Sequence, residues 1–178
     1  MASIVGLLVL SLAGLTARLL DLVRKGPPAV RHGSEALALG RIYARAGLDT
    51  RAREAYRHAC TDVSMAYRDA SMASIKIEGL RSLALLCRRA RRYEDAAAHW
   101  QELLELPACP PHVAREATQA LAIYHAHRAR DLPTAKAYAL RSLDARAAAW
   151  NQAVQHRLAR IEKKMNKSQV SRLKFENA

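Results

Sequence analysis

The side chains of this sequence that could do chemistry are a histidine pair, three cysteines, scattered carboxylates and many arginines. His125 and His127 suggest a metal site, but residues two apart on a helix point about 200° away from each other, so their imidazoles cannot share one ion. The other histidines form no H-x-x-x-H pair, the spacing that places two ligands on one helical face. We therefore expect no metal ion.

The other candidates for catalysis are equally isolated. The chain has no G-x-S-x-G motif, no glycine-rich phosphate loop and no spaced histidine partner for a cysteine. Carboxylates such as Glu94 and Glu102 stand among Arg and Gln on amphipathic segments, which is typical of solvated helix faces. An enzyme needs a polar cluster that the core pattern does not explain. We expect no catalytic residue, no cofactor and no enzymatic activity.

The number and spacing of the cysteines indicate a protein of a reducing compartment. Cys60, Cys87 and Cys109 are odd in number, widely spaced and without a C-x-x-C pair. This pattern indicates reduced, structural thiols rather than disulfides or metal ligands. We expect a cytoplasmic protein.

The arginines are the largest feature of the composition. Lys and Arg number 29 against 16 Asp and Glu, which gives a net charge of +13, and most of the cations are Arg. An anionic ligand would explain this excess. GC-rich coding, which enriches Ala and Arg together, explains it equally well.

The composition predicts an all-α fold. The 178 residues suit one ordinary domain that can bury a core without metals or disulfides. Alanine and leucine dominate the apolar fraction of 51%, whereas Val, Ile, Gly and Pro are scarce. Such a composition favours helices over sheets, collagen or disorder.

Residues 1–17 carry no charge, so this segment has three possible interpretations: a signal peptide, a membrane span or a packed helix. A signal peptide begins with a basic region, which is absent before Arg18. A membrane span needs about 20 apolar residues, and here Arg18 and Asp21 interrupt the run too early. Ser11-Leu12-Ala13 could serve as a cleavage site, so a signal peptide at 1–17 remains the alternative. One leucine stripe continues past the charges, at Leu8, Leu12, Leu15, Leu19 and Leu22. This stripe predicts a packed helix that ends at Gly26-Pro27-Pro28.

Short helices with brief breaks follow. Ser34 is the expected N-cap of the next helix, and further breaks are expected at 47–49, 91–93, 107–111 and 131–133. Three sets of residues recur at similar spacing: Gly40, Tyr43, Gly47, Ala52, Tyr56 and Ala59; then Leu83, Ala84, Tyr93, Ala96 and Trp100; then Leu121, Ala122, Ala135 and Ala139. The third set is one residue longer at its turn. Small residues let two helices approach closely, and aromatic rings fill the space beside them.

These spacings resemble tetratricopeptide repeats. The resemblance implies antiparallel helix pairs that stack as a short right-handed solenoid with capping helices. The expected parts are a packed capping helix at 1–28, three pairs at 29–149, a capping helix at 150–166 and a basic, disordered tail at 167–178.

In a tetratricopeptide stack the first helix of each pair lines the concave surface. That geometry directs five guanidinium groups toward one groove, those of Arg41, Arg45, Arg81, Arg88 and Arg89. Such a groove would favour carboxylates or phosphates through bidentate hydrogen bonds. The alternative is that these arginines merely cover solvated helix faces.

A narrower resemblance covers most of the chain. Residues 11–17 (SLAGLTA), 36–43 (ALALGRIY), 110–117 (PPHVAREA) and 125–132 (HAHRARDL) resemble the helical C-terminal region of bacterial ribonuclease-H-like proteins, predicted exonucleases. The resemblance implies that the first helix corresponds to the last helix of the nuclease domain. The resemblance also implies a metal-binding aspartate shortly before the Leu10-Ser11-Leu12 run, whereas residues 6–9 here (GLLV) contain no acid.

The function expected from the sequence is a non-enzymatic scaffold that binds a protein partner or an associated nuclease domain, away from membranes. The alternative is an accessory domain that binds nucleic acid through the arginine groove and the basic tail.

Overall fold

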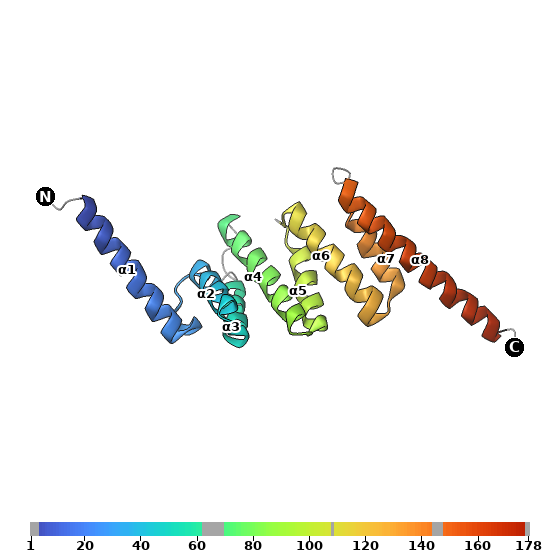
Figure 1. Ribbon diagram of the computed structural model, residues 1–178, viewed down its shortest axis with the longest axis horizontal. Helices are drawn as coiled ribbons and strands as arrows, with labels where there is room; N and C mark the ends of the chain where they lie inside the picture. Colours follow the sequence, from blue (N-terminus) through green and yellow to red (C-terminus); the bar gives the residue numbers. More distant parts are fainter. Residues whose placement is uncertain (1–3, 62–69, 108, 144–147, 177–178) are drawn as a thin grey trace. The chain divides into compact units, whose positions relative to one another are not determined.

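The computed structural model describes residues 4–61, 70–107, 109–143 and 148–176 (Figure 1). Every regular element within them is helical, which confirms the all-α prediction. The α-helices are α1 (Ile4–Lys25), α2 (Gly33–Arg45), α3 (Asp49–Thr61), α4 (Ala70–Arg89), α5 (Tyr93–Glu105), α6 (Pro111–Tyr124), α7 (Leu132–Arg141) and α8 (Ala148–Glu176). A 3-10 turn, η1 (Pro27–Ala29), and a π-helical turn, η2 (His125–Ala129), complete the set.

The chain divides into two compact units, an N-terminal unit (Met1–Leu86) and a C-terminal unit (Cys87–Ala178), with the boundary inside α4. Among the described residues, no helix has the length and apolar character that crossing a membrane requires.

The predicted breaks of the N-terminal unit have clear local causes. Helix α1 ends at Lys25 because Gly26 adopts φ 78° and Pro27 and Pro28 follow it. Gly47, with φ 74°, ends α2 in the left-handed conformation that glycine adopts without strain. The chain then re-enters a helix at Asp49, as predicted.

The predicted N-cap at Ser34 is wrong. Helix α2 begins at Gly33, its N-cap is His32, and no side chain caps it directly. Glu35 takes over part of this role, because its carboxylate accepts a hydrogen bond of 2.8 Å from the backbone N–H of Arg31. A carboxylate in the first turn also opposes the positive end of the helix dipole.

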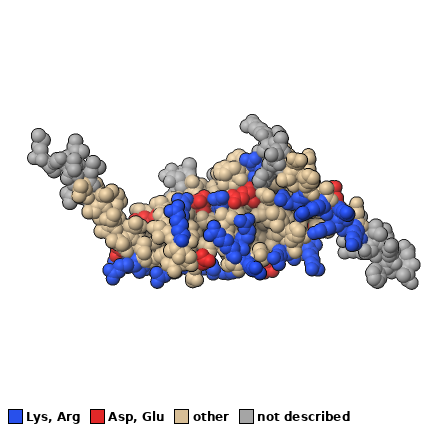
Figure 2. Space-filling view, in the orientation of Figure 1, with Lys and Arg blue, Asp and Glu red and all other residues tan. Residues whose placement is uncertain are grey.

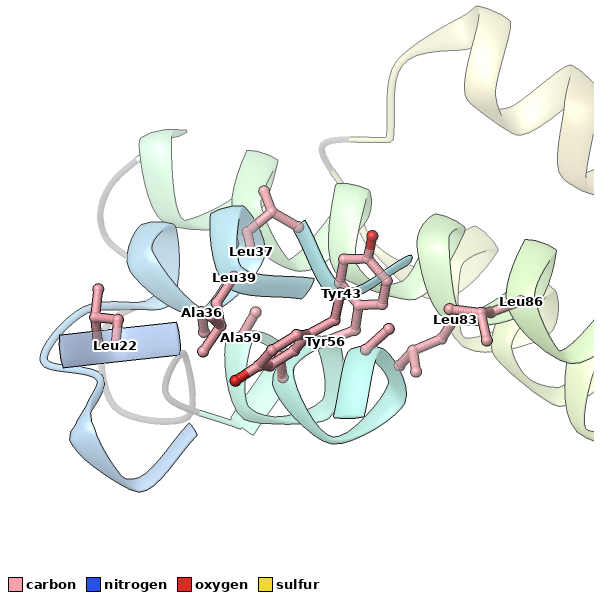
Figure 3. Packing of buried hydrophobic residues seen from close by; sticks show 11 residues of the cluster. Leu22, Ala36, Leu37, Leu39, Tyr43, Tyr56, Ala59, Leu83 and Leu86 are labelled. Carbon is pink, nitrogen blue, oxygen red and sulfur yellow. The ribbon is translucent and has the colours of Figure 1, made fainter. Parts of the chain in front are cut away.

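One apolar core holds the N-terminal unit together (Figure 3). It takes side chains from four helices: Leu22, Ala36, Leu37, Leu39, Tyr43, Ala52, Ala55, Tyr56, Ala59, Leu83 and Leu86. Helices α2 and α3 approach very closely at Gly40, where an added Cβ would lie 2.5 Å from the ring of Tyr56. The pairing of a glycine with an aromatic ring is the arrangement that the repeat spacing predicts for this crossing.

Among the described side chains of α1, those that pack on the rest of the unit lie toward its C-terminal end, which corrects the expected burial of the leucine stripe. Leu22 is buried, and the carbonyl of Val23 accepts a 2.9 Å hydrogen bond from the hydroxyl of Tyr43. Leu12, Leu15 and Leu19, in contrast, are 66%, 67% and 45% exposed. The helical period of a sequence identifies an apolar face, but it does not supply the surface that covers it.

An ion pair fixes this packed end of α1 to α2. The guanidinium of Arg18 lies 2.9 Å from Oε2 of Glu35 and also donates to the carbonyl of Ala29 at 2.9 Å. The side chains of Arg18 and Glu35 are 26% and 25% exposed, so water screens the pair only partly. The contact therefore contributes to the position of α1.

This ion pair predicts a pH dependence of stability. The Arg18 guanidinium, with the Arg31 N–H second, lowers the pKa of Glu35 from its ordinary value of 4.5. A lowered carboxyl pKa stabilises the fold fully above the ordinary value, and this contribution is lost as pH falls through the folded value. Urea unfolding of the wild type and of Glu35→Gln should therefore differ at pH 7, and the difference should shrink as the pH falls below the ordinary carboxyl pKa and through the lowered one. A difference that persists at acid pH would assign the effect to packing instead.

The C-terminal unit is built by successive contacts of α5 with α6, α6 with α7, and α7 with α8. Small side chains line the crossing of α6 and α7, where Ala122, Ala135 and Ala139 are fully buried. Val154 and Ile161 of α8 are buried against them, and Leu158 and Met165 are partly buried, so α8 packs on this cluster through one apolar face.

Residues 167–176, which were expected to belong to a disordered tail, are helical. Helix α8 continues from Ala148 to Glu176, well beyond the expected end at residue 166. The residues from 167 to 176 contain neither glycine nor proline, so nothing in the backbone interrupts the helix.

Candidate functional site

The five predicted groove arginines have different environments. In the N-terminal unit, Arg41 and Arg81 both contact Oε1 of Glu78, at 3.3 and 3.9 Å. The acid offsets part of the positive charge that an anionic ligand would need. Arg45 is exposed in the last turn of α2, where a cation suits the negative end of the helix dipole. Figure 2 shows acidic side chains among the Lys and Arg of the visible face.

Arg88 and Arg89 are exposed in the last turn of α4 and belong to the C-terminal unit. Of the two, Arg88 lines a cavity of about 220 Å³, which we call the apolar cavity. The structure therefore brings Arg41 and Arg81 together around Glu78, and it places Arg88 at a site with quite different neighbours.

Helices α5 and α6 build the apolar cavity. Ala96, Ala97 and Trp100 contribute from α5, and Ala120, Ile123 and Tyr124 from α6. The small alanine side chains leave the space between the two helices, while the larger side chains enclose it. Trp100 is only 2% exposed, so its ring forms a fixed part of the wall.

The charged or titratable side chains Arg88, His127 and Arg128 of the lining are exposed, and together with Tyr93 we call them the rim of the apolar cavity. The guanidinium carbon of Arg128 lies 4.1 Å from the centre of the Tyr93 ring, which is a cation–π contact. A second cavity, which we call the charged cavity, has about 420 Å³ and shares Tyr93, Tyr124 and Arg128 with the first. Arg128 therefore contributes to the lining of both spaces.

The π-helical turn η2 carries His127 and Arg128 to this rim. A π-helical turn holds one residue more than an α-helical turn, and the third predicted repeat is one residue longer at this place. Beyond it, Arg130 adopts φ 57°, and Oδ1 of Asp131 accepts a 3.1 Å hydrogen bond from the N–H of Thr134. The tight reversal fixes the end of η2 before α7 begins.

The two histidines of the suspected metal pair have separate surroundings. His125 packs against the rings of Tyr124 and Tyr138, with ring centres 5.2 and 5.5 Å away. His127 is exposed and lines the apolar cavity. The described part of the chain contains no group of three or more His, Cys, Asp or Glu side chains that could hold a metal ion.

Positive charge surrounds His127. Desolvation lowers its pKa, and Lys164, Arg160, Arg128 and Arg157 lower it further. We call these four residues the cationic cluster. Desolvation also lowers the pKa of Arg157, and Arg160 adds to this shift. The charged groups that act on His127 are all cations, and they would attract an anion to this side of the apolar cavity. The acids Glu94 and Asp95 line the charged cavity instead.

The thiols take no part in this site. None of Cys60, Cys87 and Cys109 forms a disulfide. Burial raises the pKa of Cys109, which favours its protonated and less nucleophilic form.

Sequence reasoning missed most of this site. It assigned Tyr93 to helix packing and did not place Tyr124, His127 or Arg128 at a binding surface. The extra residue at the third turn was the one signal in the sequence, because π-helical turns occur frequently at functional sites.

Compared with models of protein families, with curated proteins and with solved structures, the chain matches none of them.

Proposed function

We propose that this protein is a non-enzymatic helical-repeat module, with its helix pairs arranged as a right-handed tetratricopeptide-like stack, that recruits or orients a protein partner. The uncovered apolar face of α1 carries this proposal. Val9, Leu12, Leu15, Leu19 and Leu20 are 45–67% exposed. Large apolar patches on a folded protein mark interaction sites, because water disfavours their exposure.

The charge pattern of α1 favours a protein over a membrane surface. A helix that lies in a lipid interface carries Lys and Arg along its polar face, whereas residues 9–17 carry no charge. Two of the cations nearer the C-terminal end have acidic partners: Arg18 contacts Asp21 and Glu35, and Lys25 contacts Asp21 at 2.8 Å. These cations are thus already engaged within the chain.

The resemblance to ribonuclease-H-like proteins suggests the kind of partner. In that family the helix corresponding to α1 closes the nuclease domain, so a nuclease domain would cover the same leucine face. The repeat region would then act as an accessory that orients the catalytic domain.

Site-specific photo-crosslinking in the protein's own cells tests the proposal. A benzophenone amino acid replaces Leu15 in one variant and Glu54, an exposed residue of α3, in the control. We expect one protein adduct from position 15 and none from position 54. The identified partner, once purified, should bind Leu15→Asp at least about tenfold more weakly, because a charge cannot enter an apolar interface without loss. A lipid adduct, an adduct to a second copy of this chain, or identical adducts from both positions would contradict it.

The second candidate function is nucleic-acid binding, which the cationic cluster and the charge of +13 favour. It predicts binding that weakens steeply as salt rises and that is lost when Arg128, Arg157 and Arg160 of the cationic cluster are all changed to Glu. Fluorescence anisotropy of labelled single-stranded and duplex DNA and RNA at about 50 mM salt tests whether the protein binds nucleic acid. An absence of binding there removes this candidate.

A further inference from the structure

We infer that the apolar cavity of the C-terminal unit binds one large apolar side chain of an acidic peptide segment, whose carboxylates lie against the cationic rim. This inference rests on the proposed function, since it names the chemistry of a protein partner. It concerns a different surface from the leucine face of α1, and the two can fail independently.

The size of the cavity suits a single side chain. Ligand pockets for whole small molecules have about 300–1,000 Å³, and the apolar cavity has about 220 Å³. An engineered cavity of about 150 Å³ holds a benzene molecule. A leucine or phenylalanine side chain therefore fits the space between α5 and α6, and the rest of its peptide must lie outside.

The rim supplies the charge that such a peptide would meet. Arg88 and Arg128 line the apolar cavity, whereas Glu94 and Asp95, the nearby acids, line the charged cavity, where Asp95 pairs with Arg92. The cation–π contact with Tyr93 leaves the guanidinium N–H groups of Arg128 able to donate, because a ring face accepts the cation without using them. Acidic residues on either side of the apolar side chain would lie within this positive field.

A nucleobase fits the cavity less well than an aliphatic or phenyl group. Every base carries donors and acceptors along its edges, and burying them without partners costs free energy. The wall of the cavity consists of alanine, isoleucine and aromatic side chains, and its charged groups stand at the rim. Trp100, the largest ring, is already enclosed and cannot offer a stacking face.

NMR titration of the full chain with synthetic heptapeptides tests the inference. The probes are acetyl-Asp-Glu-Asp-X-Asp-Glu-Asp-amide with X as Leu, Phe or Ala, and a matched peptide with Lys at every acidic position and X as Leu. The acidic Leu and Phe peptides should shift the amide signals of Ala97, Ala120 and Ile123. The Ala peptide should bind about tenfold more weakly, because it lacks the apolar atoms that the cavity would bury. The Lys peptide should not bind.

Variants separate the cavity from its rim. Ala120→Phe should abolish binding by filling the space, whereas Ala98→Phe, at an exposed position of α5, should leave it unchanged. Because Ala120→Phe could disturb folding, Ile123→Ala, at a site already 42% exposed, provides a milder variant that should weaken binding several-fold. The double variant Arg88→Gln and Arg128→Gln should bind the acidic Leu peptide more weakly, and its affinity should depend less on salt concentration.

Three outcomes would overturn the inference. They are equal binding of the Leu and Ala peptides, equal binding of the acidic and basic peptides, and displacement of the Leu peptide by a deoxythymidine decamer that shifts the same signals. Any of these results, obtained while position 15 still crosslinks to a protein partner, would remove this inference alone. Loss of the crosslink with intact peptide binding would remove only the α1 interface.

Discussion

Replacing Gly40 by alanine should destabilise the N-terminal unit, although alanine is normally the better helix residue. Helix propensity favours alanine by about 1 kcal/mol, but the new Cβ would lie 2.5 Å from the Tyr56 ring. That ring is 4% exposed and has little room to move. Overpacking a dense core costs about 1–3 kcal/mol, and at so short a distance we expect it to exceed the gain in propensity. Urea unfolding followed by circular dichroism measures the difference.

Gly14→Ala is the matched control for this substitution. Gly14 also lies inside a helix, but no atom would come within 4 Å of its added Cβ. The same change should therefore stabilise α1 by up to about 1 kcal/mol. If Gly40→Ala stabilised the protein as Gly14→Ala does, the close crossing of α2 and α3 would be wrong.

Replacing Ala135 by leucine should destabilise the C-terminal unit by about 1–3 kcal/mol or more. Ala135 is fully buried in α7, in the same cluster as Ala122 of α6, so three further carbon atoms would have to displace its packed neighbours. The expected result is a lower urea midpoint of unfolding and faster amide hydrogen exchange in α8, because α8 packs on the same cluster through Val154.

Ala137→Leu tests whether the effect comes from the crossing itself. Ala137 lies two residues further along α7 and is exposed. Leucine there should change the free energy of unfolding by less than about 0.5 kcal/mol. A similar loss from both substitutions would mean that α7 tolerates leucine poorly for a reason other than packing.

The helices and their crossings could be predicted from the sequence because their causes are local. Gly47 and the Gly26-Pro27-Pro28 run determine where helices end through their own backbone preferences. The pairing of Gly40 with Tyr56 follows from spacing, since a helix crossing needs a small residue opposite a large one. The predicted end of the last helix, at residue 166, was wrong. The polar residues after it were interpreted as disordered, although the segment up to residue 176 contains no helix breaker.

The candidate binding site could not be predicted in this way. The contact between Arg128 and Tyr93 joins η2 to α5, and the π-helical turn changes the direction of every side chain that follows it. Periodicity likewise identified the leucines of α1 as one face but could not say that they stay uncovered. Both features depend on which surfaces meet, and a helical period does not contain that information.

Amide hydrogen exchange of α1, measured in the free protein and in its complex with the partner that crosslinking identified, tests the proposed interaction most directly. In the free protein the amides of residues 9–20 should exchange much faster than those of Leu39 and Tyr43, because most of the described side chains in this range, including Leu12, Leu15 and Leu20, are exposed. Binding of the partner should slow exchange in residues 9–20 by at least about tenfold and leave α3 unchanged. Exchange in α1 that is already slow in the free protein, or that the bound partner leaves unchanged, would contradict an interaction module built on this helix.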